Sequence, residues 1–293
     1  MSQTTTKAIL RRKVESRSGL LVPGAFNALS ARVVADMGFE AVYLSGAGLT
    51  NMLYGLPDLA FIGLQDVAQA TAAIRGAVDI PLIVDADTGF GNALNVAHTV
   101  KVLERAGADA LQLEDQVFPK RCGHFSGKEV APLGEMIGKI HAAVDARQDA
   151  DFMIIARTDA RSTQGFEVAV ERAMRMSEAG ADMLFVEATE SAAEVRRLPA
   201  LLDKPQLMNI VIGGKTPVLA QSELAALGYG IVLYANSGLQ GAVRGMQQAL
   251  GVLKADGILH ENPELVISFQ ERQRLVGKPG FDALEKKYAS PHA

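Results

Sequence analysis

The stretch that decides the fold is AGADALQLED, residues 106–115, in which a glycine precedes a short apolar run that ends in two acids. Three other stretches repeat its plan: MGFEAVYLSG (37–46), AGADMLFVEA (179–188) and LGYGIVLYAN (227–236). A glycine at this place is typical of the C-terminal end of a helix, and the apolar run that follows is typical of a buried strand. The four stretches therefore predict repeated helix-to-strand units that build a parallel sheet buried on both faces.

Apolar runs of this kind recur along the chain at residues 20–22, 41–44, 82–84, 110–113, 152–156, 183–186, 206–208 and 231–233. Eight β/α units in roughly 250 residues are typical of an α/β fold of the TIM type, a (β/α)8 barrel with its functional residues at the carboxyl ends of the strands. An open doubly wound sheet is the main alternative, but no G-x-G-x-x-G turn follows a strand. We expect the barrel over residues 1–261, with a lead-in helix at 7–15, and a C-terminal helical tail over 262–293 that is not an independent domain.

The composition excludes several classes of protein. The chain has 293 residues, of which 48% are hydrophobic, and this excludes disorder and fibrous folds. Its 29 basic and 33 acidic residues give a net charge of −4, which does not favour nucleic acid or an acidic membrane as a partner. No signal peptide and no apolar run of about 18 residues is found, and the single cysteine excludes an intrachain disulfide. We expect a soluble protein of the reducing cytoplasm.

Two aspartates, Asp85 and Asp87, end the third run in VDADTGFG (84–91). Alternate residues of an extended segment point the same way, so both carboxylates can reach one point above the barrel. Such a pair suits Mg²⁺, which keeps much of its hydration shell, although helix capping by a solvated aspartate is an alternative. Glu114 and Asp115 end the next run, where they could hold metal-bound waters or form a salt bridge to the neighbouring basic loop.

That loop is PKRCGHFSGKEVAP (119–132), and it contains the only cysteine of the chain, Cys122. Lys120, Arg121 and His124 lie close to it in sequence, and cations of this kind favour the thiolate of a reactive cysteine over a thiol that only fills the core. A Cys-His hydrolase fits less well, because no orienting partner is evident and the carboxylates would have no task.

Polar residues also follow the other runs. Arg157 can receive a carboxylate or phosphate, or can pair with Asp159 or Glu187. YLSGAG (43–48) can present backbone N–H groups and a hydroxyl to an anion, or can form a simple tight turn. Asn209 follows the seventh run and adds a further polar group.

Together these motifs resemble the isocitrate lyase/phosphoenolpyruvate mutase superfamily over essentially the whole chain. The resemblance is carried by YLSGAG (43–48), PD (57–58), VDADTGFG (84–91), LEDQ (113–116), KRCGH (120–124) and ARTDA (156–160). KRCGH is similar to the signature of the carbon–carbon lyase branch, and phosphonate mutases generally lack its cysteine. The resemblance implies a lyase that cleaves a substituted 2-hydroxy dicarboxylate, of the 2,3-dimethylmalate or 2-methylisocitrate type, to a 2-oxo acid and a carboxylate. An oxaloacetate hydrolase or decarboxylase is the alternative, and a phosphonate mutase is a more distant one.

The resemblance also implies roles for single residues. Asp85 and Asp87 would hold Mg²⁺ or Mn²⁺, with Glu114 in its water shell. Cys122 would be the catalytic acid with Arg121 and His124 beside it, and Tyr43 is our candidate for the base. The remaining residues of the substrate site would be Ser45, Gly46, Ala47, Asp58, Gly123, Arg157, Glu187 and Asn209. The resemblance further implies a homotetramer whose subunits exchange their C-terminal helices.

Two segments depart from the pattern of 2-methylisocitrate lyases. Many of those enzymes carry a glutamate three residues after the asparagine, where this chain has Ile212, and a Tyr-Pro-Leu-Ser segment where it has Tyr234-Ala235-Asn236-Ser237. Both segments border the region for the distal half of the substrate, which disfavours a tricarboxylate. A barrel that only binds or scaffolds would have lost the acid pair or the cysteine loop, and both are intact.

Overall fold

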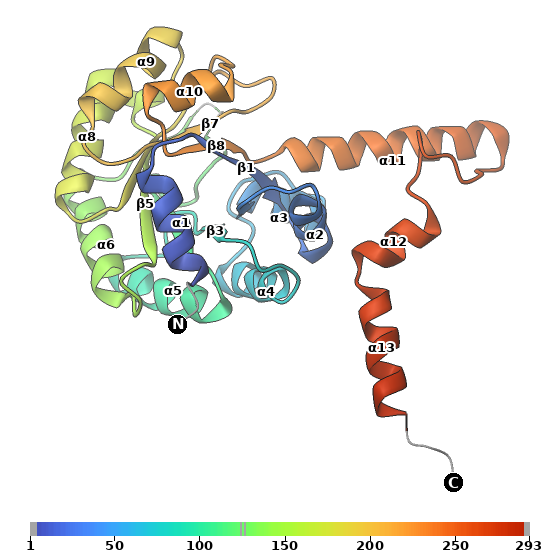
Figure 1. Cartoon of the computed structure of the whole chain (residues 1–293). Coiled ribbons are helices and arrows are strands. Elements are labelled where there is room, and N and C mark those ends of the chain that lie inside the picture. Colours follow the sequence, from blue (N-terminus) through green and yellow to red (C-terminus); the bar gives the residue numbers. More distant parts are fainter. Residues whose placement is uncertain (1–4, 124, 126, 290–293) are drawn as a thin grey trace. The chain divides into compact units, whose positions relative to one another are not determined.

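The computed structural model describes residues 5–123, 125 and 127–289, and the chain forms two compact units that divide after Ser237. In the first unit eight strands form a barrel with helices around it (Figure 1). The strands are β1 (Leu20–Ala25), β2 (Val42–Leu44), β3 (Leu82–Asp85), β4 (Ala110–Glu114), β5 (Met153–Thr158), β6 (Met183–Val186), β7 (Leu207–Asn209) and β8 (Ile231–Tyr234). All eight runs predicted from the sequence are confirmed as strands.

The strands are parallel and lie in the order β6-β5-β4-β3-β2-β1-β8-β7. A parallel bridge between Leu184 of β6 and Gln206, just before β7, joins the two ends of this order and closes the barrel. The predicted (β/α)8 barrel is therefore confirmed, and the open doubly wound sheet is excluded. Because the strands are parallel, all their carboxyl ends meet at one rim of the barrel.

The helices of this unit are α1 (Thr6–Glu15), α2 (Ala28–Asp36), α3 (Gly46–Tyr54), α4 (Leu64–Arg75), α5 (Ala93–Ala106), α6 (Leu133–Ala146), α7 (Arg161–Gln164), α8 (Phe166–Glu178), α9 (Ala192–Leu201) and α10 (Gln221–Leu227). Four of them end at or next to the glycines of the repeated phrase, Gly38, Gly107, Gly180 and Gly228, whose φ angles lie between 81° and 104°. This left-handed conformation costs glycine little, which explains why the phrase repeats.

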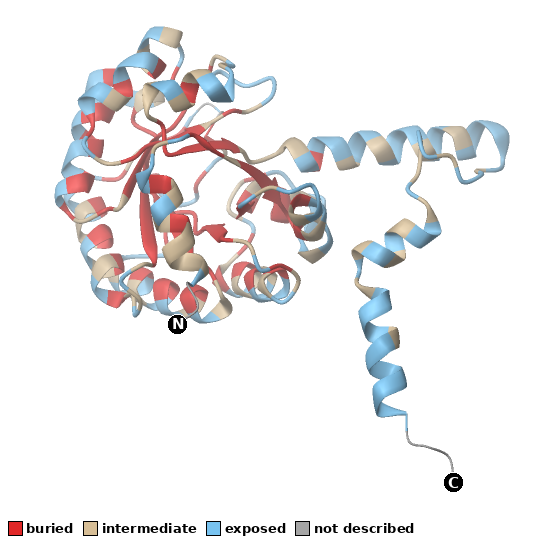
Figure 2. Ribbon diagram, in the orientation of Figure 1, coloured by how far each residue is buried: buried red, intermediate tan, exposed pale blue. Residues whose placement is uncertain are grey.

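The interior of the barrel is filled by alternate residues of the strands. Ile83 of β3, Ile155 of β5 and Phe185 of β6 belong to this interior cluster, and Leu10 and Val14 of α1 complete it. A larger cluster packs the outer faces of the strands against the surrounding helices, so the strands are buried on both sides (Figure 2). The lead-in helix expected from the sequence is thus part of the barrel core.

The second unit contains α11 (Ser237–Asp256), which begins at the last residue of the first unit, α12 (Phe269–Leu275) and α13 (Lys278–Tyr288). Gly277, at φ 78°, separates α12 from α13, and Pro279 lies in the first turn of α13. Among the described residues of this unit only Leu239 is buried. The barrel range 1–261 and the tail range 262–293 stay predictions. Across the described residues, no helix combines the length and apolar character that crossing a bilayer requires.

Candidate active site

The candidate site is the last inward-facing layer of the barrel. Alternate residues of a strand face the same side, and on six strands the residue two positions after the last apolar residue of the interior cluster is polar. These polar residues are Ser45, Asp85, Gln112, Arg157, Glu187 and Asn209, and all of them except Gln112 line one cavity at the carboxyl rim. The structure therefore brings together residues that are up to 164 positions apart in the chain.

The two aspartates meet around Gly46. A Cβ atom on Gly46 would lie 3.2 Å from both Asp85 Oδ2 and Asp87 Oδ1, so the glycine leaves room for both carboxylates. The reason given from the sequence is wrong in one respect: Asp87 is not extended but has φ 47°. The backbone N–H of Asp87 instead donates to Asp85 Oδ1 at 3.2 Å, and this turn directs the second carboxylate back to the first.

YLSGAG places the N-terminus of α3 at the same point. Ser45 caps the helix and accepts a hydrogen bond from the Gly48 N–H at 3.1 Å. The Gly46 N–H donates to Asp85 Oδ2 at 3.3 Å, and Ala47 lines the cavity. The unsatisfied N–H groups and the positive end of the helix dipole favour negative charge here.

Lys120 lies among the carboxylates. Its ammonium is buried, with Nζ 2.5 Å from Asp58 Oδ1 and 2.9 Å from Asp87 Oδ1. The neighbouring carboxylates keep the pKa of Lys120 well above its ordinary value even though burial opposes this. Its place in the sequence predicts that this cation serves the thiol, whereas in the structure its ammonium pairs with Asp58 and Asp87.

The segment around Cys122 is held through its backbone. The Cys122 N–H donates to the Asp58 carbonyl at 3.2 Å, and its half-buried side chain lines the cavity. The side chain of Gln116 clamps the backbone of Arg121 with two hydrogen bonds, while the Arg121 side chain is exposed at the cavity edge. His124 lies outside the described residues.

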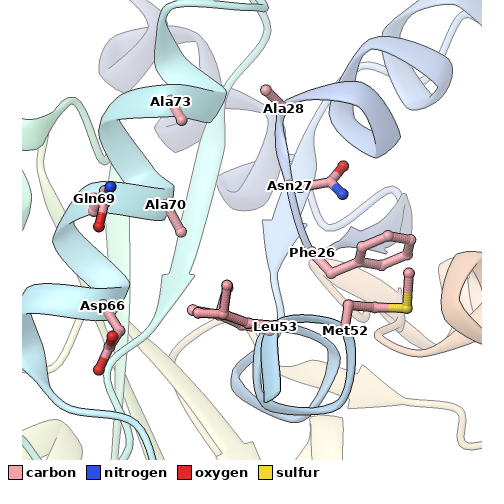
Figure 3. A pocket seen from close by; sticks show the side chains of 10 residues that line it. Phe26, Asn27, Ala28, Met52, Leu53, Asp66, Gln69, Ala70 and Ala73 are labelled. Carbon is pink, nitrogen blue, oxygen red and sulfur yellow. The ribbon is translucent and has the colours of Figure 1, made fainter. Parts of the chain in front are cut away.

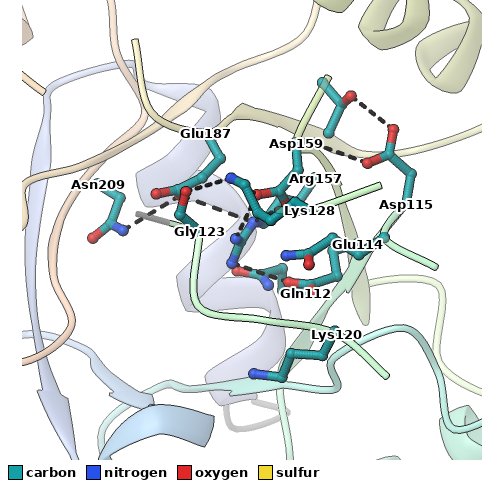
Figure 4. A network of polar contacts seen from close by, with 12 residues as sticks. Gln112, Glu114, Asp115, Lys120, Gly123, Lys128, Arg157, Asp159, Glu187 and Asn209 are labelled. Atoms are coloured by element: carbon teal, nitrogen blue, oxygen red, sulfur yellow. Dashed lines mark hydrogen bonds and ion pairs between the residues drawn. The ribbon is translucent and has the colours of Figure 1, made fainter. Parts of the chain in front are cut away.

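Arg157 is surrounded by three carboxylates (Figure 4). It binds Asp159 through Nε at 3.0 Å and Nη2 at 3.1 Å, and its Nη1 lies 3.0 Å from Glu114 Oε2. Glu187 Oε2 is 3.9 Å from Nε and accepts a hydrogen bond from Asn209 at 3.4 Å. The pairing expected as an alternative for Arg157 is thus present, with Asp159 as the main partner.

Tyr43 is fully enclosed, and its hydroxyl donates to Gln112 Oε1 at 2.7 Å. Burial, followed by the charge of Asp85, raises the pKa of Tyr43 well above its ordinary value. A neutral phenol is a poor proton acceptor, so Tyr43 can serve as the base only where a cation beside Asp85 lowers this pKa. Gln112 also donates to Asp85 Oδ1 at 3.2 Å, so it holds both the Tyr43 hydroxyl and the Asp85 carboxylate in place.

The donor set fits a hydrated divalent cation. Among the described residues of the site, the buried carboxylates Asp58, Asp85, Asp87, Glu114, Asp159 and Glu187 outnumber the buried cations Lys120, Lys128 and Arg157. Burial, with Asp85 and Asp58 adding to it, raises the pKa of Asp87 to about 7 although Lys120 opposes the shift. Glu114 Oε1 is buried and lacks a hydrogen-bond partner among the described residues.

Among the described residues, no three side chains of His, Cys, Asp or Glu converge as direct metal ligands. The pair of Asp85 and Asp87 suits Mg²⁺, which takes one or two carboxylates and keeps several of its waters.

The cavity at the rim has a volume of about 40 Å³, far below the several hundred Å³ of typical ligand pockets. The room for a substrate in this structure is therefore small. A larger cavity of about 240 Å³ lies outside the barrel between α2, α3 and α4 (Figure 3). Its one carboxylate, Asp66, already accepts hydrogen bonds from Tyr54 and the Gly63 N–H, so that cavity offers no comparable chemistry.

Sequence reasoning missed Gln112 and Lys128, and gave Asp159 only a partner role. Gln112 could have been found, because it occupies an inward position of β4 between Ala110 and Glu114. Lys128 carries no such signal, since it lies in an irregular loop. The carboxylate of Asp115 forms its salt bridge with Arg172 of α8 at 2.9 Å, whereas its backbone carbonyl accepts a hydrogen bond from Ala131 of the 119–132 loop at 2.7 Å.

A parallel barrel with a carboxylate-rich pocket at its carboxyl rim defines an enzyme of the TIM-barrel class. A family model described as phosphoenolpyruvate phosphomutase matches residues 10–253. The chain belongs to the phosphoenolpyruvate mutase/isocitrate lyase superfamily, and it is an enzyme of the lyase branch.

Two relatives represent that branch. The chain is 41% identical to 2,3-dimethylmalate lyase of Eubacterium barkeri, over 97% of this chain and 99% of the relative. It is 43% identical to 2-methylisocitrate lyase of Aeropyrum pernix, over 94% and 88%.

Solved structures agree with this assignment. A crystal structure of 2,3-dimethylmalate lyase matches with a TM-score of 0.92 and 34% identity over 98% of this chain and 97% of that one. Oxaloacetate acetylhydrolase with 3,3-difluorooxalacetate matches with a TM-score of 0.93 and 31% identity over 99% of both chains. Phosphonopyruvate hydrolase, in a complex with oxalate and Mg²⁺, matches with a TM-score of 0.88 and 32% identity over 98% of this chain and 100% of that one.

Proposed function

We propose that the protein is a Mg²⁺-dependent carbon–carbon lyase that cleaves a 2-hydroxy dicarboxylate with small alkyl substituents, of the 2,3-dimethylmalate type, to pyruvate and a monocarboxylate. The observation that carries the proposal is that Asp85, Arg157 and Cys122 line one cavity, with Asp87 beside Asp85 at Gly46. The similarity to 2,3-dimethylmalate lyase over nearly the full length of both chains supports the choice of substrate class.

Asp85 and Asp87 would hold the metal, with Glu114 reaching it through water. When bound, Mg²⁺ supplies positive charge that orients the C1 carboxylate and the 2-oxygen and stabilises the negative charge that develops there. Mn²⁺ has similar ligand preferences and is expected to substitute.

The protein's own groups then divide the remaining work. Arg157 and the N-terminus of α3, at Ser45, Gly46 and Ala47, bind substrate carboxylates, and Asn209 adds a hydrogen bond. A base, for which Tyr43 is our candidate, takes the proton of the 2-hydroxyl. The C2–C3 bond breaks, its electron pair moves to C3 and is delocalised into the neighbouring carboxylate, and the 2-oxo acid is released.

Cys122 completes the cycle as the acid. Its Sγ–H delivers a proton to C3, which yields the monocarboxylate, and the thiolate is reprotonated from solvent as the base gives up its proton. Arg121 and His124 supply the positive charge for the developing dianion, since Lys120 is engaged by Asp58 and Asp87. Asp58 thereby holds Lys120 beside the metal position, and Glu187 and Gly123 shape the wall around Arg157.

The lining of the cavity supports a dicarboxylate over a tricarboxylate. Apolar side chains make up part of its wall, namely Phe185, Val211, Leu233 and Ala235. Among the described residues the cations of the lining are Lys120, Arg121 and Arg157, and Lys120 is already held by Asp58 and Asp87. A third carboxylate on the substrate would meet methyl groups, whereas small alkyl substituents pack against them.

A substrate panel tests the proposal. The protein is incubated with Mg²⁺ and, separately, 2,3-dimethylmalate, 2-methylisocitrate, oxaloacetate and phosphonopyruvate, with EDTA-treated protein as the control. We expect pyruvate and propionate from 2,3-dimethylmalate, and no product in EDTA. Succinate from 2-methylisocitrate at a higher kcat/KM would refute the size argument, and oxalate from oxaloacetate as the dominant reaction would make the protein a hydrolase.

We also propose a homotetramer in which the C-terminal helices are exchanged between subunits. The support is the second unit itself, whose described helices bury a single residue and expose large apolar side chains such as Met246, Leu250 and Phe281. A native mass equal to four chains by light scattering supports the assembly, and a monomer at micromolar concentration contradicts it.

A further inference from the structure

Lys128 is a buried ammonium in an otherwise exposed stretch of the loop between β4 and α6. Its side chain is 1% exposed, while Gly127 and Glu129 on either side are exposed. A lysine is rarely buried without partners, because removing its charge from water is costly. Two partners accept from Lys128 Nζ: Asp159 Oδ1 at 2.6 Å and the backbone carbonyl of Gly123.

The first partner connects Lys128 to the substrate-binding arginine. Asp159 is 0% exposed and binds Lys128 with one oxygen and Arg157 with both (Figure 4). The main chain at Asp159 is held in place as well, because its N–H donates to Asp115 Oδ1 at 2.9 Å, and Asp115 is held by Arg172 and Thr158. Asp159 is therefore a fixed point of the barrel rim.

The second partner connects Lys128 to the thiol. Gly123 follows Cys122 directly, and it passes so close to Arg157 and Glu187 that a Cβ there would lie 2.6 Å from Glu187 Cγ. The chain is therefore pinned on both sides of the thiol: the Cys122 N–H by the Asp58 carbonyl, and the Gly123 carbonyl by Lys128.

We propose that Lys128 is a positioning residue of the active site, which ties the backbone next to Cys122 to Asp159 and so fixes the distance between the thiol and Arg157. The effect on catalysis rests on the proposed role of Cys122 as the acid. The effect on the position of the loop does not.

The test replaces Lys128 by methionine and measures the alkylation of Cys122 by iodoacetamide, which reports on one site because the chain has a single cysteine. The alkylation rate is recorded as a function of pH. Its plateau at high pH measures how accessible the Cys122 thiolate is, and the midpoint of the curve responds to the loss of a nearby charge. Arg147→Met is the matched control: it removes a part-buried ion pair to Asp182 at 2.6 Å, just before β6 and so at the amino end of the barrel.

We expect the plateau rate of Lys128→Met to rise about tenfold or more, since a buried ion pair no longer opposes local opening of the loop. Its kcat should fall about 100-fold with a smaller change in KM, the cost of misplacing a reacting group by about 1 Å. Arg147→Met should leave the plateau rate and kcat unchanged. Lys128→Gln keeps a hydrogen-bond donor for the Gly123 carbonyl without the charge, and it replaces Lys128→Met if that variant does not fold. Its plateau alkylation rate and its kcat should lie between those of the wild type and Lys128→Met.

Equal plateau rates in wild type and Lys128→Met, equal acceleration in Arg147→Met, or an unchanged kcat would each overturn the assignment. The alkylation rate needs no substrate, so it tests the positioning role of Lys128 even if the proposed reaction is wrong. Turnover by Cys122→Ser tests the proposed reaction without involving Lys128.

Discussion

Replacing Asp87 by asparagine should stabilise the metal-free protein at neutral and alkaline pH. Burial and the charges of Asp85 and Asp58 raise the pKa of this carboxyl from 3.8 to about 7 in the folded state. Below pH 3.8 the group is protonated whether the chain is folded or unfolded. Between pH 3.8 and about 7 the unfolded chain loses the proton while the folded chain keeps it, so stability falls as the pH rises, and the loss is complete above pH 7.

At 1.36 kcal/mol per pH unit, the shift of the Asp87 pKa corresponds to a loss of about 4 kcal/mol in the free energy of unfolding. The isosteric amide of Asp87→Asn does not ionise and so avoids this loss. Urea unfolding of both proteins in EDTA, at pH 5 and at pH 8, measures it. From pH 5 to pH 8 we expect the free energy of unfolding of Asp87→Asn to rise by about 2 to 4 kcal/mol relative to that of the wild type. A stability difference that does not change with pH would show that Asp87 carries no desolvation penalty.

Magnesium provides the complementary measurement. At 100 times its dissociation constant, Mg²⁺ should stabilise the wild type at pH 8 by about 2.7 kcal/mol through mass action, and Asp87→Asn by much less. Equal stabilisation of the two proteins would place the metal away from Asp87.

Three further substitutions test single residues of the site. Cys122→Ser should retain binding of Mg²⁺ and oxalate in calorimetry while turnover falls by about 10²–10⁴, because the alcohol is a far weaker acid, and near-normal turnover would remove Cys122 from the role of acid. Arg157→Lys should lower kcat/KM about 100-fold, since an ammonium cannot replace the bidentate guanidinium, and a change below about twofold would mean that Arg157 only serves the Asp159 ion pair. Gly46→Ala places a Cβ 3.2 Å from oxygens of both aspartates, so we expect weaker Mg²⁺ binding in titration calorimetry with little loss of stability, and an unchanged affinity would contradict the proposed position of the metal.

The strands and the inward layer of the site follow from local sequence patterns, because burial on two faces requires short apolar runs and alternation decides which residues face inward. The positions that directly follow the apolar runs therefore predict which polar residues reach the rim of the barrel, namely Arg157, Glu187 and Asn209.

The surroundings of the thiol could not be predicted in the same way. Lys120 and Lys128 have long side chains on an irregular loop, and partners that lie 31 to 62 positions away in sequence decide where their charges go. The turn at Asp87 was missed for a related reason, since its φ of 47° accompanies a hydrogen bond from its N–H to the Asp85 side chain, which no local apolar pattern indicates.

The apolar wall of the cavity bears on how such an enzyme can change during evolution. Val211 and Ala235 follow β7 and β8, whereas Asp85 ends β3, Asp87 follows it and the cysteine lies on the loop after β4. The proposed function thus assigns substrate range and bond-breaking chemistry to separate segments of one barrel. A duplicated gene could acquire a new substrate through one or two changes after β7 and β8 without losing its reaction on the way.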